Sequence, residues 1–134
     1  MMKILLDSNV ILDLFTEDPV WFNWSAQTVA QYAENHILII NPIIYAEISI
    51  RFSSIEELED LLLDTYFEKI NLPWEACFLA GKCFLQYKKS NGKKTNTLPD
   101  FFIGAHAAVS KFPLITRDIN RYKTYFPSVE LIHP

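Results

Sequence analysis

The sequence predicts an α/β protein built on a parallel sheet, and two observations support that prediction. Short apolar runs alternate with longer amphipathic stretches along the 134 residues, a pattern typical of strands that alternate with helices. Half of the residues are hydrophobic and only three are glycine, so the chain can build a sizeable core and is not disordered. A chain of this length predicts a single domain, 1–134.

The first half of the chain begins with an apolar run at 3–6, which predicts a strand. A helix is expected over 19–35, where aromatic and aliphatic residues recur at helical spacing. The four aliphatic residues at 37–40 predict a buried strand. Proline is favoured in the first turn of a helix, so the next helix is expected from Pro42 towards Phe52.

The middle of the chain predicts two more helices and a short strand. Ser54-Ile55-Glu56-Glu57 fits a capping box and begins a strongly acidic helix. A strand at 69–72 and a helix at 73–89 are expected to follow, and Ser90-Asn91-Gly92 predicts a loop.

The last part of the chain predicts one helix and two strands. Pro99 begins a helix that extends to about Lys111. Apolar runs at 114–116 and 129–132 predict the final strands, and Pro127 separates the last two elements.

Four acidic residues interrupt apolar stretches, where an unpaired carboxylate is costly to bury. Asp7 and Asp118 each follow a predicted strand, Asp100 lies in the first turn of a helix, and Glu47 is the only charged residue over 37–50. Ligands of a parallel α/β sheet bind beyond the carboxyl ends of its strands, so all four acids can face one crevice. Clustered carboxylates are normally held by a hard divalent cation, Mg²⁺ or Mn²⁺. Because such a site hydrolyses phosphodiester bonds, the leading hypothesis is a nuclease.

Each acid also has a structural interpretation of its own. Asp7 can cap the helix that follows it, and Asp100 can complement a helix dipole. Asp118 can cap a turn before Arg121, and Glu47 can pair with a distant base. The four acids together are more specific than any one of them.

The net charge of −4 conceals two oppositely charged halves. Residues 1–75 hold 13 acids and three bases, a charge of −10, whereas residues 76–134 hold three acids and nine bases, a charge of +6. The lysines that cluster in the second half are Lys82, Lys88, Lys89, Lys93 and Lys94. Such a cluster either attracts a polyanion or is a solvated helix end with its loop.

Four segments occur in an order that points to a family. They are Leu5-Leu6-Asp7-Ser8-Asn9-Val10-Ile11-Leu12-Asp13, Tyr45-Ala46-Glu47-Ile48, Pro99-Asp100-Phe101-Phe102-Ile103-Gly104-Ala105-His106-Ala107 and Thr116-Arg117-Asp118. Together they resemble the PIN-domain ribonucleases, and most closely the VapC-type toxins of bacterial toxin–antitoxin pairs. The resemblance implies a three-layer α/β/α sandwich with a mostly parallel sheet, and an endoribonuclease that depends on Mg²⁺ or Mn²⁺.

The resemblance also implies roles for individual residues. The catalytic and metal-binding acids would be Asp7, Glu47, Asp100 and Asp118. Residues that orient these acids by hydrogen bonds would be Ser8, Asn9 and Thr116. Arg117 is a candidate for contact with RNA, although it fits a salt bridge at the rim at least as well. The basic cluster adds the loop lysines Lys93 and Lys94 as further candidates.

Three further positions carry expectations. The family often has a small residue after the third acid, so Phe101 is expected to restrict how closely substrate approaches that side. His106 is expected to pack beneath the site, and Asp13 is expected to be structural.

Two rival functions keep a related fold. The first is a catalytically silent PIN-like module that binds RNA or protein, and the presence of all four acids argues against it. The second is a phosphatase or phospho-receiver with Asp7 as its nucleophile. A dehalogenase-type phosphatase needs an acid where Asn9 stands, and the acidic pair and late lysine of a receiver are not evident.

The toxin resemblance implies two protein partners, a small antitoxin and a second copy of the chain in a homodimer. Aromatic residues such as Trp21, Phe22 and Trp24 supply apolar surface for such interfaces. No apolar run approaches the ~18 residues that cross a bilayer, and no signal-peptide core is evident. We therefore expect a cytoplasmic protein without a membrane partner.

Overall fold

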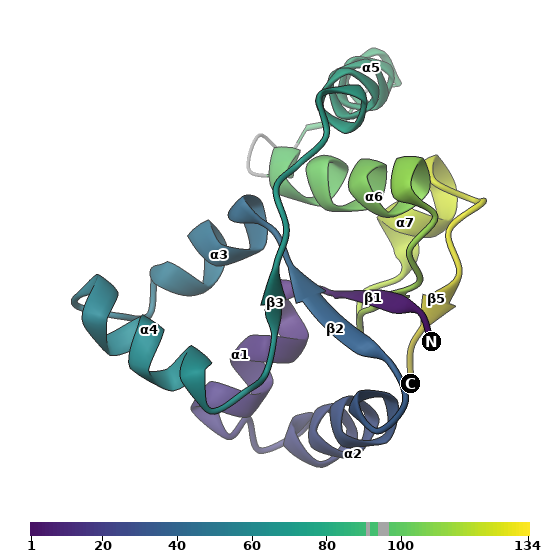
Figure 1. Cartoon of the computed structure of the whole chain (residues 1–134). Helices are drawn as coiled ribbons and strands as arrows, with labels where there is room; N and C mark the ends of the chain where they lie inside the picture. The colour runs from purple at the N-terminus through teal and green to yellow at the C-terminus, as the bar shows by residue number, and fades with distance from the viewer. Residues whose placement is uncertain (91, 94–96) are drawn as a thin grey trace.

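In the residues that the structure describes, five parallel strands form one sheet in the order β3-β2-β1-β4-β5. The structure is a computed structural model that describes residues 1–90, 92–93 and 97–134 (Figure 1). The strands are β1 (Lys3–Leu6), β2 (Ile37–Ile40), β3 (Glu68–Lys69), β4 (Leu114–Ile115) and β5 (Leu131–Ile132). The helices are α1 (Ser8–Thr16), α2 (Phe22–Ala33), α3 (Pro42–Ser49), α4 (Ile55–Leu63), α5 (Trp74–Lys89), α6 (Leu98–Ser110) and α7 (Asn120–Tyr125).

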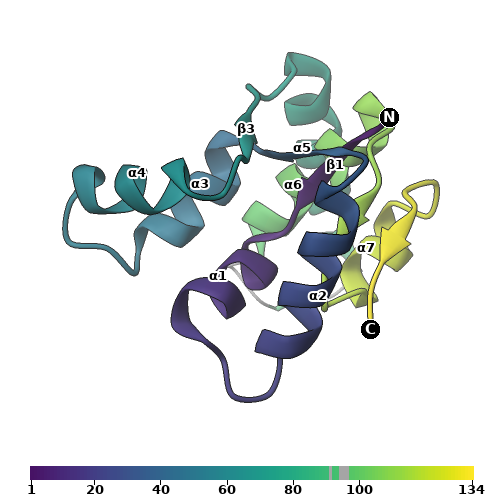
Figure 2. The same cartoon turned by 60° about the horizontal axis from the view of Figure 1, so that its bottom comes forward.

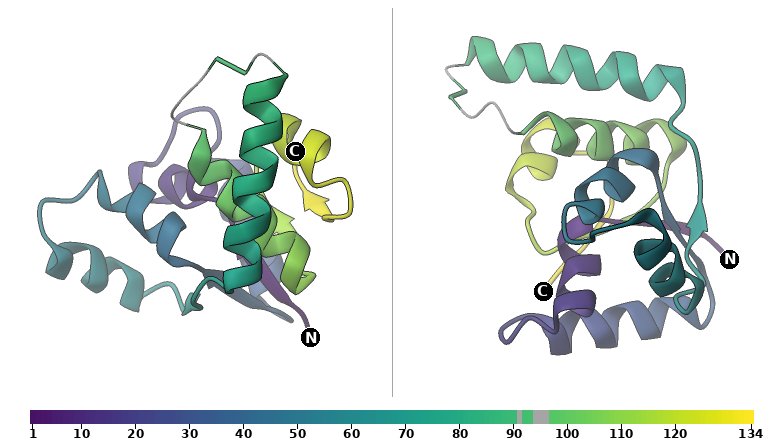
Figure 3. Two further views of the ribbon diagram at one scale, coloured as in Figure 1. Left: turned by 90° about the horizontal axis from the view of Figure 1, so that it is seen from above. Right: turned by 90° about the vertical axis from the view of Figure 1, so that its left-hand side faces the viewer.

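Helices cover both faces of the sheet. α1 and α2 lie on one side, and α6 lies on the other with α5 stacked outside it (Figures 1 and 3). α3 and α4 extend away from the sheet as a pair (Figure 2). The arrangement confirms the α/β/α sandwich that the sequence predicts.

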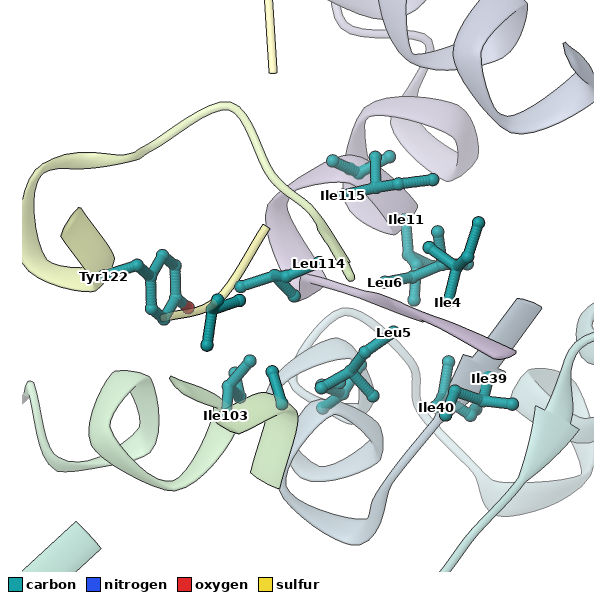
Figure 4. Packing of buried hydrophobic residues seen from close by; sticks show 14 of the residues in the cluster. Ile4, Leu5, Leu6, Ile11, Ile39, Ile40, Ile103, Leu114, Ile115 and Tyr122 are labelled. Carbon is teal, nitrogen blue, oxygen red and sulfur yellow. The ribbon is translucent and has the colours of Figure 1, made fainter. Parts of the chain in front are cut away.

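The core lies around the central strand. Ile4, Leu5 and Leu6 of β1 are fully buried, because successive side chains of a strand face opposite layers and both layers here are helices. Figure 4 shows Leu5 near Ile103 of α6, and Tyr122 of α7 on the same side of the sheet.

The predicted elements are present, with shifted ends. The helix expected over 19–35 begins at Phe22, and the strand expected at 69–72 is shorter and begins at Glu68. The Ser54 hydroxyl accepts a hydrogen bond from the Glu57 amide at 3.2 Å, as the predicted cap requires. α7 was not predicted, and α1 was expected only as the helix that Asp7 can cap.

The strand order determines where a site can form. The chain adds β2 and β3 on one side of β1 and then returns to add β4 and β5 on the other. The carboxyl ends of β1 and β4 therefore border the point where the order reverses, which is where ligands of such sheets bind. No helix among the described residues is long and apolar enough to span a membrane.

Candidate metal-binding site

Asp7 stands at this point, directly after β1, and is the N-cap residue of α1. It is almost completely buried, with 3% of its surface exposed. The Ser8 amide donates to Oδ1 over 2.8 Å. The hydroxyls of Thr116 and Tyr122 donate to Oδ2 over 2.9 and 2.8 Å. Residues that follow β1, follow β4 and belong to α7 thus converge on one carboxylate.

Burial raises the pKa of the Asp7 carboxyl from 3.8 to about 7. The hydrogen bonds from Tyr122 and Thr116 lower this pKa, whereas the charges of Asp100 and Glu47 raise it. Burial also raises the pKa of Glu47, and the charge of Asp100 adds to that effect. Asp7, Glu47 and Asp100 are therefore near enough to repel one another.

Glu47 reaches the site from helix α3. Asn41 caps this helix by accepting a hydrogen bond from the Ile44 amide. The Ser8 hydroxyl donates to Oε1 of Glu47 over 2.8 Å. Because Ser8 also binds Asp7 through its amide, one residue orients two of the acids.

Asp100 lies in the first turn of α6, where its charge suits the positive end of the helix dipole. The guanidinium of Arg121 donates to Oδ2 of Asp100 from Nη1 over 2.7 Å. The structure therefore places a cation from α7 directly against one of the predicted metal ligands.

Asp118 occupies the rim of the site. It is exposed, and its amide donates to the Thr116 hydroxyl over 3.1 Å. That hydroxyl is the one that donates to Asp7, so Asp118 is linked to the buried acid through Thr116. Its carboxylate lines a pocket together with Arg121 and Asn120.

The donor set fits a hard divalent cation in its chemistry. Buried carboxylates that raise one another's pKa values are stabilised by such a cation. Oδ1 of Asn9 is a buried acceptor that has no hydrogen-bond partner among the described residues. This oxygen can therefore accept a hydrogen bond from a further group that enters the site. As the side chains stand, no three His, Cys, Asp or Glu residues of the described chain are arranged to hold one ion. The Asp100–Arg121 ion pair is one contact with which an ion would compete.

The other predicted positions are placed as follows. The Asn9 side chain donates to the Thr116 hydroxyl over 3.4 Å. Arg117 forms a salt bridge with Asp13 at the far end of α1, through Nε at 2.9 Å and Nη2 at 3.1 Å. Lys93 is exposed, and Lys94 lies outside the described residues.

Asp13 has the structural role expected of it. It is 2% exposed, and it accepts a second hydrogen bond from the Ser25 hydroxyl of α2 over 2.8 Å. The Arg117 guanidinium also lies 5.5 Å from the ring centroid of Trp21. These contacts join α1 and α2 to the segment after β4.

His106 and Phe101 both point into the protein interior. His106 is 1% exposed, and its Nδ1 lies 3.0 Å from Nδ2 of Asn41. Phe101 is fully buried and contacts the rings of Tyr87 and Tyr125. The expectation that Phe101 restricts substrate is wrong, because its ring faces the aromatic contacts between α5, α6 and α7.

Two residues at the site, Arg121 and Tyr122, were not predicted as functional. Both belong to α7, a helix of six residues that is too short for a hydrophobic period to reveal. The only sequence signal is their position three and four residues after Asp118, which is one helical turn.

The geometry defines a class of site: acidic side chains joined by hydrogen bonds at the carboxyl edge of a parallel sheet. Residues 4–127 match the family pattern of the PIN domain. The chain belongs to the PIN domain family, in which metal-dependent nuclease activity is typical.

Solved structures with the same fold come from toxin–antitoxin complexes. VapBC2 from Rickettsia felis, bound to a DNA fragment from its promoter, is 20% identical with a TM-score of 0.75, covering 99% of both chains. VapBC-1 from nontypeable Haemophilus influenzae is 21% identical with a TM-score of 0.71, covering 98% of both. A toxin–antitoxin complex from Klebsiella pneumoniae is 22% identical with a TM-score of 0.69, covering 94% of both. No curated protein matches the chain.

Proposed function

We propose that the chain is an endoribonuclease that hydrolyses RNA phosphodiester bonds with Mg²⁺ or Mn²⁺ as its cofactor. The observation that carries this proposal is that Ser8 hydrogen-bonds both Asp7 and Glu47 at one edge of the sheet, and the charge of Asp100 raises the pKa of both acids. An acid with a pKa near 7 is costly to keep ionised unless a cation binds beside it. Membership of the PIN domain family supports the same activity.

Each residue of the site has its own role in this proposal. Asp7, Glu47 and Asp100 would hold the ion, with Asp118 as a further ligand from the rim. When bound, the divalent ion supplies an activated water and stabilises the leaving oxygen of the phosphodiester. The Ser8 hydroxyl orients Glu47, and the hydroxyls of Thr116 and Tyr122 orient Asp7 and favour its charged form.

We also propose that the protein is the toxin of a toxin–antitoxin pair and forms a homodimer. The likeness to toxin–antitoxin complexes supports the antitoxin partner. Trp21, Phe22 and Trp24, which the sequence suggested for interfaces, are only partly exposed. Trp74 and Phe78 of α5 are 87% and 69% exposed and lie one turn apart on one face. They provide the apolar surface that a protein partner needs.

The activity is tested with purified protein and single-stranded RNA. Cleavage is expected with Mg²⁺ or Mn²⁺ and is expected to stop with EDTA or with Asp7→Asn. Asp60→Asn, at an exposed acid of α4, is the matched control and should cleave normally. Cleavage that survives both EDTA and Asp7→Asn contradicts metal dependence, and RNA binding without cleavage favours the silent module.

The toxin role is tested separately. Light scattering is expected to give a dimer, and the product of a neighbouring small gene is expected to bind the protein and inhibit cleavage. A monomer that has no such neighbour contradicts this part of the proposal and leaves the nuclease activity intact.

A further inference from the structure

A pocket of about 300 Å³ opens beside the acids, between the end of α5 and α7. Its lining consists of Tyr87, Asp118, Asn120, Arg121, Thr124 and Tyr125. Arg121 is the one arginine or lysine in that lining, and Asp118 is the one acid. The pocket therefore borders the acidic site and contains a cation together with neutral hydrogen-bonding groups.

Arg121 lies between this pocket and the acids. Its Nη1 donates to Oδ2 of Asp100 over 2.7 Å. Its guanidinium carbon lies 5.3 Å from the ring centroid of Tyr87 and 5.7 Å from that of Phe101. Two aromatic rings thus hold the planar group in place, and the side chain is still 20% exposed.

Arg117, the other arginine near the site, is placed differently. It binds the buried carboxylate of Asp13 with two nitrogens, so its donors are directed away from the acids. Arg121 instead binds Asp100, an acid that a divalent cation would also bind. A cation that binds Asp100 would therefore release the donors of Arg121 from their ion pair and would leave those of Arg117 bound to Asp13.

We propose that the pocket between α5 and α7 binds a backbone phosphate of the RNA next to the scissile one, with Arg121 as its ligand. In the metal-free protein, Arg121 is instead held in its ion pair with Asp100. This inference rests on the proposed function. Arginine presents several donors in one plane, which suits the oxygens of a phosphate. A cation that takes Asp100 leaves those donors facing the pocket, so the phosphate subsite forms when the metal binds.

The coupling has an electrostatic reason. Without metal, the carboxylates repel an RNA phosphate, and the Asp100–Arg121 pair neutralises part of their charge. With metal, the cation takes over that neutralisation and Arg121 supplies a positive charge for the polyanion. Binding of the metal and binding of the substrate therefore favour each other.

The test compares Arg121→Met with Lys123→Met, which removes an equal charge from the same helix at an exposed position. Methionine keeps much of the packing on Tyr87 and Phe101. Calorimetric titration with Mn²⁺, without RNA, is expected to give about threefold to tenfold tighter binding for Arg121→Met because its competitor is gone. Cleavage assays in Mn²⁺ are expected to give a KM raised about tenfold for the same variant. Lys123→Met should change neither value appreciably.

A second variant covers the case in which Arg121→Met folds poorly. Arg121→Lys keeps the charge, so its Mn²⁺ affinity and KM are both expected to lie between those of wild type and Arg121→Met. Equal or weaker Mn²⁺ binding by the variants overturns the competition for Asp100, and an unchanged KM overturns the phosphate subsite. A wild-type protein that binds Mn²⁺ but does not cleave RNA contradicts the proposed function, whereas an active wild type with variants that match Lys123→Met contradicts only this inference.

Discussion

The hydroxyl of Tyr122 donates a hydrogen bond to Oδ2 of Asp7 over 2.8 Å, across a sequence separation of 115 residues. Tyr122 is 2% exposed, and burial, together with the neighbouring charges of Asp7 and Asp100, raises its pKa well above 10. It is therefore a neutral donor at any physiological pH. The bond links the short helix α7 to the end of the central strand.

Removing this donor with Tyr122→Phe should lower the free energy of unfolding most at the pH values at which Asp7 is charged. A hydrogen bond to a charged acceptor contributes about 1.5–3 kcal/mol, against about 0.5–1.5 kcal/mol for a neutral one. Urea unfolding of the metal-free protein should therefore show that the substitution lowers the free energy of unfolding more at pH 8 than at pH 5. An equal loss at both pH values would show that the contribution of the hydroxyl does not depend on the charge of Asp7.

Asp7→Asn should stabilise the metal-free protein at high pH. The folded-state pKa of Asp7 is about 7 and its ordinary value is 3.8, so the unfolded chain ionises first. The stability that Asp7 contributes therefore falls as pH rises from about 4 to about 7, by roughly 4 kcal/mol in total. The difference in unfolding free energy between Asp7→Asn and wild type should grow across this window and be flat outside it. A difference that does not vary with pH would exclude a buried acid with a raised pKa.

Ser8→Ala should impair metal binding with little effect on the fold. The hydroxyl that orients Glu47 is lost, and loss of such an orienting group typically weakens metal affinity or activity about 10–100-fold. Titration with Mn²⁺ measures the effect. Ser49→Ala, whose hydroxyl binds a carbonyl of the same α3 helix, is the control and should bind Mn²⁺ as wild type does.

Arg117→Met should destabilise the protein without changing RNA binding by the molecules that remain folded. The substitution leaves the carboxylate of Asp13 buried with Ser25 as its remaining partner. Because Arg117 is 29% exposed, we expect a loss of about 1–3 kcal/mol, less than for a fully buried pair. Thermal unfolding and KM are measured together. A raised KM with normal stability would show that Arg117 contacts the RNA.

Gly104→Ala should disturb the attachment of the C-terminal segment to α6. A Cβ at this position would lie 2.3 Å from the ring of Phe126, which is buried. Overpacking of this kind costs about 1–3 kcal/mol. Phe126→Leu in the same chain should recover part of the loss in denaturant unfolding, and a lack of any recovery would show that another contact is responsible.

The sequence was sufficient to predict the fold because its main signals are local. The aliphatic run of β2 and the proline at the start of α3 each specify an element by residue type alone. Strand ends were less predictable, since β3 is set by pairing with β2 and not by its own two exposed residues. α7 was missed because its contacts are tertiary.

The candidate site could be predicted in part. Asp7, Glu47 and Asp100 are candidates because a charge inside an apolar stretch requires an explanation, and in the structure Ser8 hydrogen-bonds both Asp7 and Glu47. The exposed position of Asp118 and the partner of Arg117 depend on how the segment after β4 folds, which spacing does not specify. Phe101 was misjudged because its neighbours, Tyr87 and Tyr125, come from other helices.

The central place of β1 has a consequence during synthesis. Asp7 directly follows this strand, yet the donors Thr116 and Tyr122 are translated 109 and 115 residues later, in the segment after the neighbouring strand β4. A ribosome-bound chain that lacks these residues has Asp7 but not the groups that orient it. Under the proposed function, a cell is thus shielded from unfinished copies of the enzyme, because hydrolysis of RNA must wait until the segment after β4 has left the ribosome.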